Sequence, residues 1–174
     1  DISKNYCNSL ISYSRRNSTI VNIGQVSIGG KNPIRVQSMT TTNTMDTKGT
    51  VQQCIRMIKA GCELVRITAP SIKEAQNLKY IKSELKNKGF ETPLIADIHF
   101  TPKAAEVAAN YVEKIRINPG NYIDKKKFQT YEYTDYEYNL ELEKINDRFS
   151  PLVILCRENG TAMRIGTNHG SLSD

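Results

Sequence analysis

The stretch KIRINPGN, residues 114–121, is typical of a β-strand that runs into a tight turn. Side chains alternate between the two faces of a strand, so Lys114, Arg116 and Asn118 are expected to share one face and the two isoleucines the other. A core-facing strand would carry leucine where this one carries an arginine and an amide. The polar face therefore needs an explanation that packing does not supply.

Strand and helix patterns alternate on both sides of this stretch. Strands are expected in IRVQSM (34–39), CELVRIT (62–68), PLIADIHF (93–100), EKIRIN (113–118) and TAMRIGTNHG (161–170). Helices are expected between them, with ends marked by Gly61, by Ser71 and Gly89, by Thr101 and Asn110, and by Thr134 and Gly160. The segment 19–30 is predicted to form a β-hairpin, and TTTNTMDTKG (40–49) a polar loop.

Short connections between alternating strands and helices predict an α/β fold with a parallel sheet. A doubly wound sheet and a (β/α)₈ TIM barrel both fit, but no strand is followed by the GxGxxG turn of dinucleotide-binding sheets. The barrel is favoured. Since a whole barrel takes about 250 residues, we expect residues 19–174 to form its N-terminal part, about five βα units preceded by the hairpin. Residues 1–18 are interpreted as a polar leader or the remnant of a transit region.

Composition narrows the function classes. The 174 residues are 39% hydrophobic and 24% charged, and no apolar run is long enough for a membrane span, so no membrane partner is expected. The net charge of +6 favours anionic partners. Nucleic acid is not expected, because the one lysine cluster beside tyrosines, Lys125 to Lys127, is followed by acidic residues.

Four cysteines lie far apart, with no CxxC pair and no histidine at ligand spacing. We interpret Cys7, Cys54, Cys62 and Cys156 as reduced thiols and predict no metal site among them.

In parallel α/β folds the ligand binds at the carboxyl ends of the strands. Arg66, Arg116 and Arg164 stand near the ends of three different predicted strands. A lone arginine at such a place is often only solvated or half of a weak salt bridge. Three at equivalent positions favour a diphosphate clamp, since a guanidinium matches phosphate oxygens with two parallel donors.

Other polar residues follow the same strand ends. Asp97 and His99 end the third predicted strand, Asn118 the fourth, and Asn168 the fifth. These four complete the candidate substrate-binding set, and no residue is assigned a catalytic role. The direction of the neighbouring His169 is left open.

Five motifs, taken in order, resemble the strand motifs of the 4-hydroxy-3-methylbut-2-enyl diphosphate synthase family of the non-mevalonate isoprenoid pathway. They are IRVQSMT (34–40), LVRIT (64–68), LIADIHF (94–100), KIRINPGN (114–121) and AMRIGTNHGSLSD (162–174). The acidic, tyrosine-bearing stretch YTDYEYNLELEKI is most similar to the plant and apicomplexan form, with the long bacterial form close behind. A plastid or apicoplast is therefore the expected compartment, and a bacterial cytoplasm the alternative.

The resemblance implies a TIM barrel followed by a separate domain with a [4Fe–4S] cluster. The implied reaction is the reductive ring opening and dehydroxylation of 2-C-methyl-D-erythritol 2,4-cyclodiphosphate, with two electrons from ferredoxin or flavodoxin. By motif, the three arginines would hold phosphate oxygens, Asn118, Asn168 and His99 would orient the substrate, and Asp97 would fix its neighbours. Whether the protein forms a homodimer is left open.

The sequence given stops at Asp174, before the rest of the barrel and the cluster ligands that the resemblance implies. Residues 1–174 alone are thus expected to be inactive. They are also expected to self-associate, because an incomplete barrel exposes a strand edge and apolar surface. Two alternatives remain at this stage: a non-catalytic anion-binding module, and another phosphate- or pterin-binding TIM-barrel enzyme.

Overall fold

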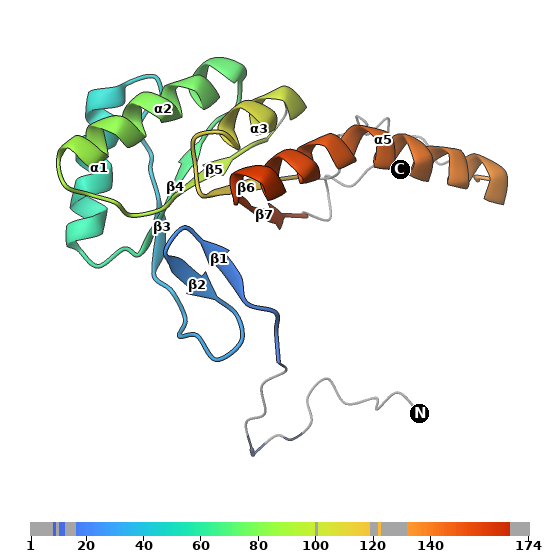
Figure 1. Ribbon diagram of the computed structural model, residues 1–174, viewed down its shortest axis with the longest axis horizontal. Coiled ribbons are helices and arrows are strands. Elements are labelled where there is room, and N and C mark those ends of the chain that lie inside the picture. The colour runs from blue at the N-terminus through green and yellow to red at the C-terminus, as the bar shows by residue number, and fades with distance from the viewer. Residues whose placement is uncertain are drawn as a thin grey trace.

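A computed structural model describes residues 9, 11–12, 17–99, 101–118, 122 and 132–167 of the chain. Five parallel strands form one sheet in sequence order: β3 (Gln37–Met39), β4 (Leu64–Thr68), β5 (Leu94–Asp97), β6 (Lys114–Ile117) and β7 (Ala162–Ile165). A separate antiparallel hairpin, β1 (Val21–Ile23) and β2 (Val26–Ile28), precedes them. In Figure 1 the helices lie along one side of the sheet and the hairpin lies on the other. The predicted hairpin and five parallel strands are confirmed.

The helices between the strands are α1 (Thr47–Lys59), α2 (Ile72–Asn87), α3 (Pro102–Ala108) and α5 (Asp135–Asn159). Helix α5 has the predicted N-cap, because Thr134 and Glu137 form a reciprocal capping box. It ends as predicted at Gly160, whose φ of 66° is left-handed. None of the described helices combines the length and the apolar composition that a membrane crossing requires.

Three local predictions need correction. Helix α1 starts inside the segment predicted as loop, because the Asp46 carboxylate accepts a hydrogen bond from the Gly49 amide at 2.9 Å and caps the helix. Thr101 stands at the N-cap of α3 but makes no capping bond, and its hydroxyl donates to the Pro70 carbonyl instead. The strands are shorter than predicted: β5 ends at Asp97, so His99 lies beyond it.

The two faces of the sheet differ in character. The helix-facing side chains of the strands are buried and apolar, among them Val65, Ile67, Ala96, Ile115 and Ile117. At the amino end of the other face, Leu64 and Ile95 pack against Ile23 of the hairpin, which is fully buried. This small cluster, which we call the floor, closes the amino end of the face that points away from the helices, which we call the inner face of the sheet. The alternation predicted for residues 114–117 is thereby confirmed.

Candidate anion-binding site

All the ionisable side chains of the five described strands lie on the inner face, above the floor. They are Arg66, Asp97, Lys114, Arg116 and Arg164. The parallel register brings them together, because Asp97 pairs with Arg116 and Arg116 pairs with Arg164 across neighbouring strands. Four cationic groups thus share this face with one carboxylate.

Asp97 is the centre of the arrangement. Its side chain is only 1% exposed and lies between β4 and β6. Arg66 Nη2 is 2.6 Å from Oδ2, Arg116 Nη1 is 3.3 Å from Oδ1, and His99 Nε2 is 3.0 Å from Oδ2. One buried carboxylate therefore positions two guanidinium groups and an imidazole, which the sequence placed near each other without showing the contacts.

Arg116 is held from a second side as well. Its Nη2 donates to the carbonyl of Gly166 at 2.9 Å. A Cβ added to Gly166 would stand 2.2 Å from Arg116 Nε, so any larger residue there would displace the guanidinium. Gly166 was not among the predicted site residues. It follows the end of β7 directly, but it fell inside the longer predicted strand 161–170, where its place two residues after Arg164 was the available signal.

The other two arginines are less completely paired. Arg66 Nε is buried and has no hydrogen-bond acceptor among the described residues. Arg164 is exposed and forms no ion pair within the part of the chain that the structure describes. Both therefore retain donors that an anion could accept.

Lys114 shares this face, as predicted from the alternation, but it was not included in the candidate set. It is 8% exposed. Burial, and then the positive charges of Arg164 and Arg66, lower the pKa of its amine below the ordinary value. Asn118 is buried directly after β6. Asn168 and His169 lie outside the described residues.

The loop after β3 is hydrogen-bonded to the carboxyl end of β4. The Thr40 amide donates to the Arg66 carbonyl at 2.9 Å, and the Thr44 hydroxyl donates to the Thr68 carbonyl at 2.6 Å. Asn77 of α2 donates in turn to the Thr44 carbonyl. These bonds to backbone atoms fix the loop beside the arginines.

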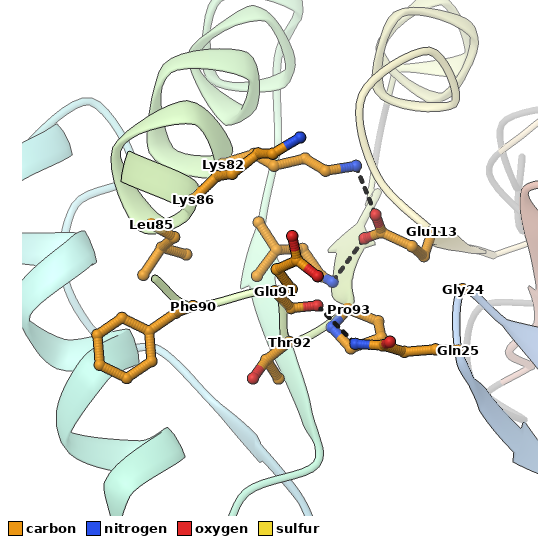
Figure 2. A pocket seen from close by; sticks show the side chains of 11 residues that line it. Gly24, Gln25, Lys82, Leu85, Lys86, Phe90, Glu91, Thr92, Pro93 and Glu113 are labelled. Carbon is orange, nitrogen blue, oxygen red and sulfur yellow. Dashed lines mark hydrogen bonds and ion pairs between the residues drawn. The ribbon is translucent and has the colours of Figure 1, made fainter. Parts of the chain in front are cut away.

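A separate cavity of about 340 Å³ lies at the opposite, amino end of the strands, between α2 and the hairpin turn at Gly24. Figure 2 shows Glu113 at its edge, where the carboxylate accepts hydrogen bonds from Lys82 at 2.5 Å and from the Leu94 amide at 2.9 Å. These bonds tie α2 to β5 and to the residue before β6. The cavity lies at the wrong end of the strands to contact the arginines.

The described cysteines do not fit an iron–sulfur cluster. Cys54 on α1 and Cys156 on α5 are buried in the helix-side core. Burial raises the pKa of Cys54 to about 11 and also raises that of Cys156, which opposes the thiolate form that binds metal. Within the described ranges, no three His, Cys, Asp or Glu side chains are grouped to hold a metal ion.

A parallel sheet with helices on one face and ionisable side chains on the other is the arrangement typical of the (β/α)₈-barrel class of proteins. Residues 18–174 match the GcpE TIM-barrel domain, so the chain belongs to this family. The expected TIM-barrel fold and family are thereby confirmed.

Several relatives carry the name 4-hydroxy-3-methylbut-2-en-1-yl diphosphate synthase (flavodoxin), and two of them serve as examples. The chain is 58% identical to the one from Phocaeicola vulgatus over 166 residues. This match covers 95% of this chain and 27% of the relative. It is 57% identical over 162 residues to the one from Leptospira interrogans, covering 93% of this chain and 24% of the relative. The chain spans about a quarter of the length of these relatives.

Among solved structures, a 7,8-dihydropteroate synthase from Vibrio fischeri matches with a TM-score of 0.42 and 16% identity, over 83% of this chain and 63% of that one. A likeness of this size adds nothing to the functional argument.

Proposed function

We propose that the full-length protein is a 4-hydroxy-3-methylbut-2-enyl diphosphate synthase, and that the inner face of this segment binds the diphosphate of its substrate. The substrate is 2-C-methyl-D-erythritol 2,4-cyclodiphosphate, whose ring is opened and whose hydroxyl is removed by reduction. The observation that carries the proposal is the cluster of Arg66, Arg116 and Arg164 on the inner face of the sheet in a member of this family.

In this proposal Asp97 acts as a positioning residue. A carboxylate accepts hydrogen bonds but cannot attract another anion, so Asp97 serves by fixing Arg66 and Arg116. Each guanidinium has five N–H donors and spends only some of them on described partners. The remaining donors would bind phosphate oxygens without first having to be ordered.

Asn118, Asn168 and His99 are proposed to orient the rest of the substrate. Asn118 is buried directly after β6, two residues from Arg116 in the chain. The imidazole of His99 lies against Asp97, which favours a fixed ring direction. The role of Asn168 rests on the motif alone.

The reductive chemistry is proposed to come from outside this segment. The described cysteines do not fit a cluster, so a [4Fe–4S] centre would be held by residues downstream of Asp174. A CxxC followed by a later cysteine and a glutamate is the sequence expected there. The relatives' names specify flavodoxin, which we take as the first candidate donor, with ferredoxin as the second.

The organisms of the relatives bear on the proposed compartment. The relatives above are bacterial, which fits the alternative of a bacterial cytoplasm. A plastid or apicoplast, with the plant or apicomplexan form of the enzyme, stays a prediction.

The test is a turnover assay on the full-length protein with its cluster reconstituted. Reduced flavodoxin and the cyclic diphosphate are expected to give 4-hydroxy-3-methylbut-2-enyl diphosphate, measured by mass spectrometry. Failure to form this product at full iron content would overturn the proposal.

A further inference from the structure

Lys114 lies at the floor end of the site, at the same level as Arg66, because both residues are in register with Ile95 of β5. It begins β6 and lies in register with Ile95 of β5 and Ala162 of β7, which belong to or pack against the floor. Its side chain faces the inner side of the sheet, because Ile115 next to it packs among the helices. Lys114 is therefore one of two cationic residues of the described strands, with Arg66, that are in register with the floor residue Ile95.

This amine has no anionic partner among the described residues. Arg66 on β4, Arg116 on β6 and Arg164 on β7 are like charges, and β3 contributes only Gln37, Ser38 and Met39. Asp97 on β5 is the one carboxylate on this face of the described strands. Both its oxygens are taken, Oδ2 by Arg66 and His99 and Oδ1 by Arg116.

A buried ammonium group without a counter-charge is unstable, and it either loses its proton or acquires an anion. Lys114 is more than nine-tenths buried, and its pKa is already lowered, by burial first and then by Arg164 and Arg66. The buried, unpaired Nε of Arg66 points to the same shortage of acceptors. A doubly charged anion would reverse these conditions.

We propose that Lys114 is a further binding residue for the diphosphate, contacting it from the floor side, and that binding of the anion draws a proton from solvent onto the Lys114 amine. The inference rests on the proposed function and adds a residue and a proton-coupled step to it. No bond of the substrate changes in this step: where the amine of the free protein is neutral, it takes one proton from solvent and becomes an ammonium ion beside the phosphate.

The test is calorimetric titration of the oxidised full-length protein with the cyclic diphosphate, in buffers of different ionisation enthalpy. Each phosphorus of the ligand carries one strongly acidic hydroxyl, so the ligand's own charge stays constant between about pH 7 and pH 9.5. Proton uptake on binding is expected in the wild type, increasing as pH rises toward the pKa of Lys114 in the free protein.

Three variants separate the contributions. Lys114→Met is expected to bind about 10- to 100-fold more weakly and without this proton uptake, because it lacks the charge. Lys114→Arg is expected to retain most of the affinity without proton uptake, because arginine stays charged. Lys86→Met changes an exposed lysine at the opposite end of the strands and is expected to behave as wild type.

Wild-type affinity in Lys114→Met, or unchanged proton uptake in Lys114→Arg, would overturn the inference and leave the proposed function standing. A wild-type protein that does not bind the cyclic diphosphate would overturn both. Thermal melting of each variant checks that it is folded, and Lys114→Met is expected to melt no lower than wild type, since it removes a buried charge.

Discussion

The Arg116 guanidinium lies 3.3 Å from the Asp97 carboxylate, across the register pair that joins β5 to β6. Both side chains are nearly inaccessible to water, with 9% and 1% exposed. An ion pair so placed contributes little net stability compared with apolar side chains, but it fixes the geometry of both partners.

Replacing Asp97 should unfold the site. Asp97→Asn leaves the buried Arg116 and the partly buried Arg66 without this counter-charge, so the free energy of unfolding should fall by about 3 kcal/mol. Urea denaturation measures this. Glu141→Gln, which breaks the exposed pair with Lys144 on α5, is the control and should change it by less than about 0.5 kcal/mol. Equal effects of the two substitutions would show that Asp97 is not a structural centre.

Gly166→Ala should weaken anion binding through Arg116. The added Cβ would collide with the guanidinium, which must leave its place between Asp97 and the Gly166 carbonyl. Gly160→Ala is the control, because its Cβ meets no atom and only the left-handed φ of 66° is strained, costing about 1–2 kcal/mol of stability. Titration with the cyclic diphosphate should show reduced affinity in the first variant only, and the reverse pattern would contradict this account.

The sequence predicted the inner face but not its pairing. Alternation along KIRIN correctly separated Arg116 from the isoleucines, since the period of two is a backbone property. The contacts of Asp97 depend on the register between neighbouring strands, which no single strand encodes. Lys114 was visible on the same face, yet its lack of a counter-ion among the described residues emerges only when the charges of all five strands are placed together.

Two local predictions were wrong where a polar side chain could form a hydrogen bond with more than one backbone group. The polar segment 40–49 gave no apolar periodicity, so the first turn of α1 was predicted as loop. Asp46 capped it all the same. Thr101 had the right residue type for a cap, but its hydroxyl donates to the Pro70 carbonyl and makes no capping bond.

Lys114 should make stability depend on pH in a defined direction. Its folded pKa is lowered, so between the folded value and the ordinary value of 10.5 the unfolded chain binds more protons and stability rises with pH. The destabilisation is fully present below the folded pKa. The gain in unfolding free energy of Lys114→Met over wild type should therefore be largest near neutral pH and shrink toward about pH 10. A difference that is constant or grows with pH would contradict the assignment.

The buried cysteines should be unreactive and dispensable for iron binding. At about pH 8 the Cys54 thiol, with a pKa of about 11, is almost wholly protonated and is also buried. Iodoacetamide followed by mass spectrometry should modify the partly exposed Cys62 before Cys54 and Cys156. Cys54→Ala in the full-length protein should leave the iron content unchanged, and a loss of iron without a loss of folded protein would show that a ligand had been misassigned.

The most direct test of the diphosphate site is the affinity of the oxidised full-length protein for the cyclic diphosphate, compared among wild type, Arg116→Ala and Arg56→Ala. Arg56 is exposed on α1, so its loss removes the same charge away from the inner face. Arg116→Ala is predicted to weaken binding by about 1.5–3 kcal/mol, or roughly 10- to 150-fold, while Arg56→Ala binds as wild type. Equal affinity of Arg116→Ala and wild type would contradict the claim that this strand face binds the diphosphate.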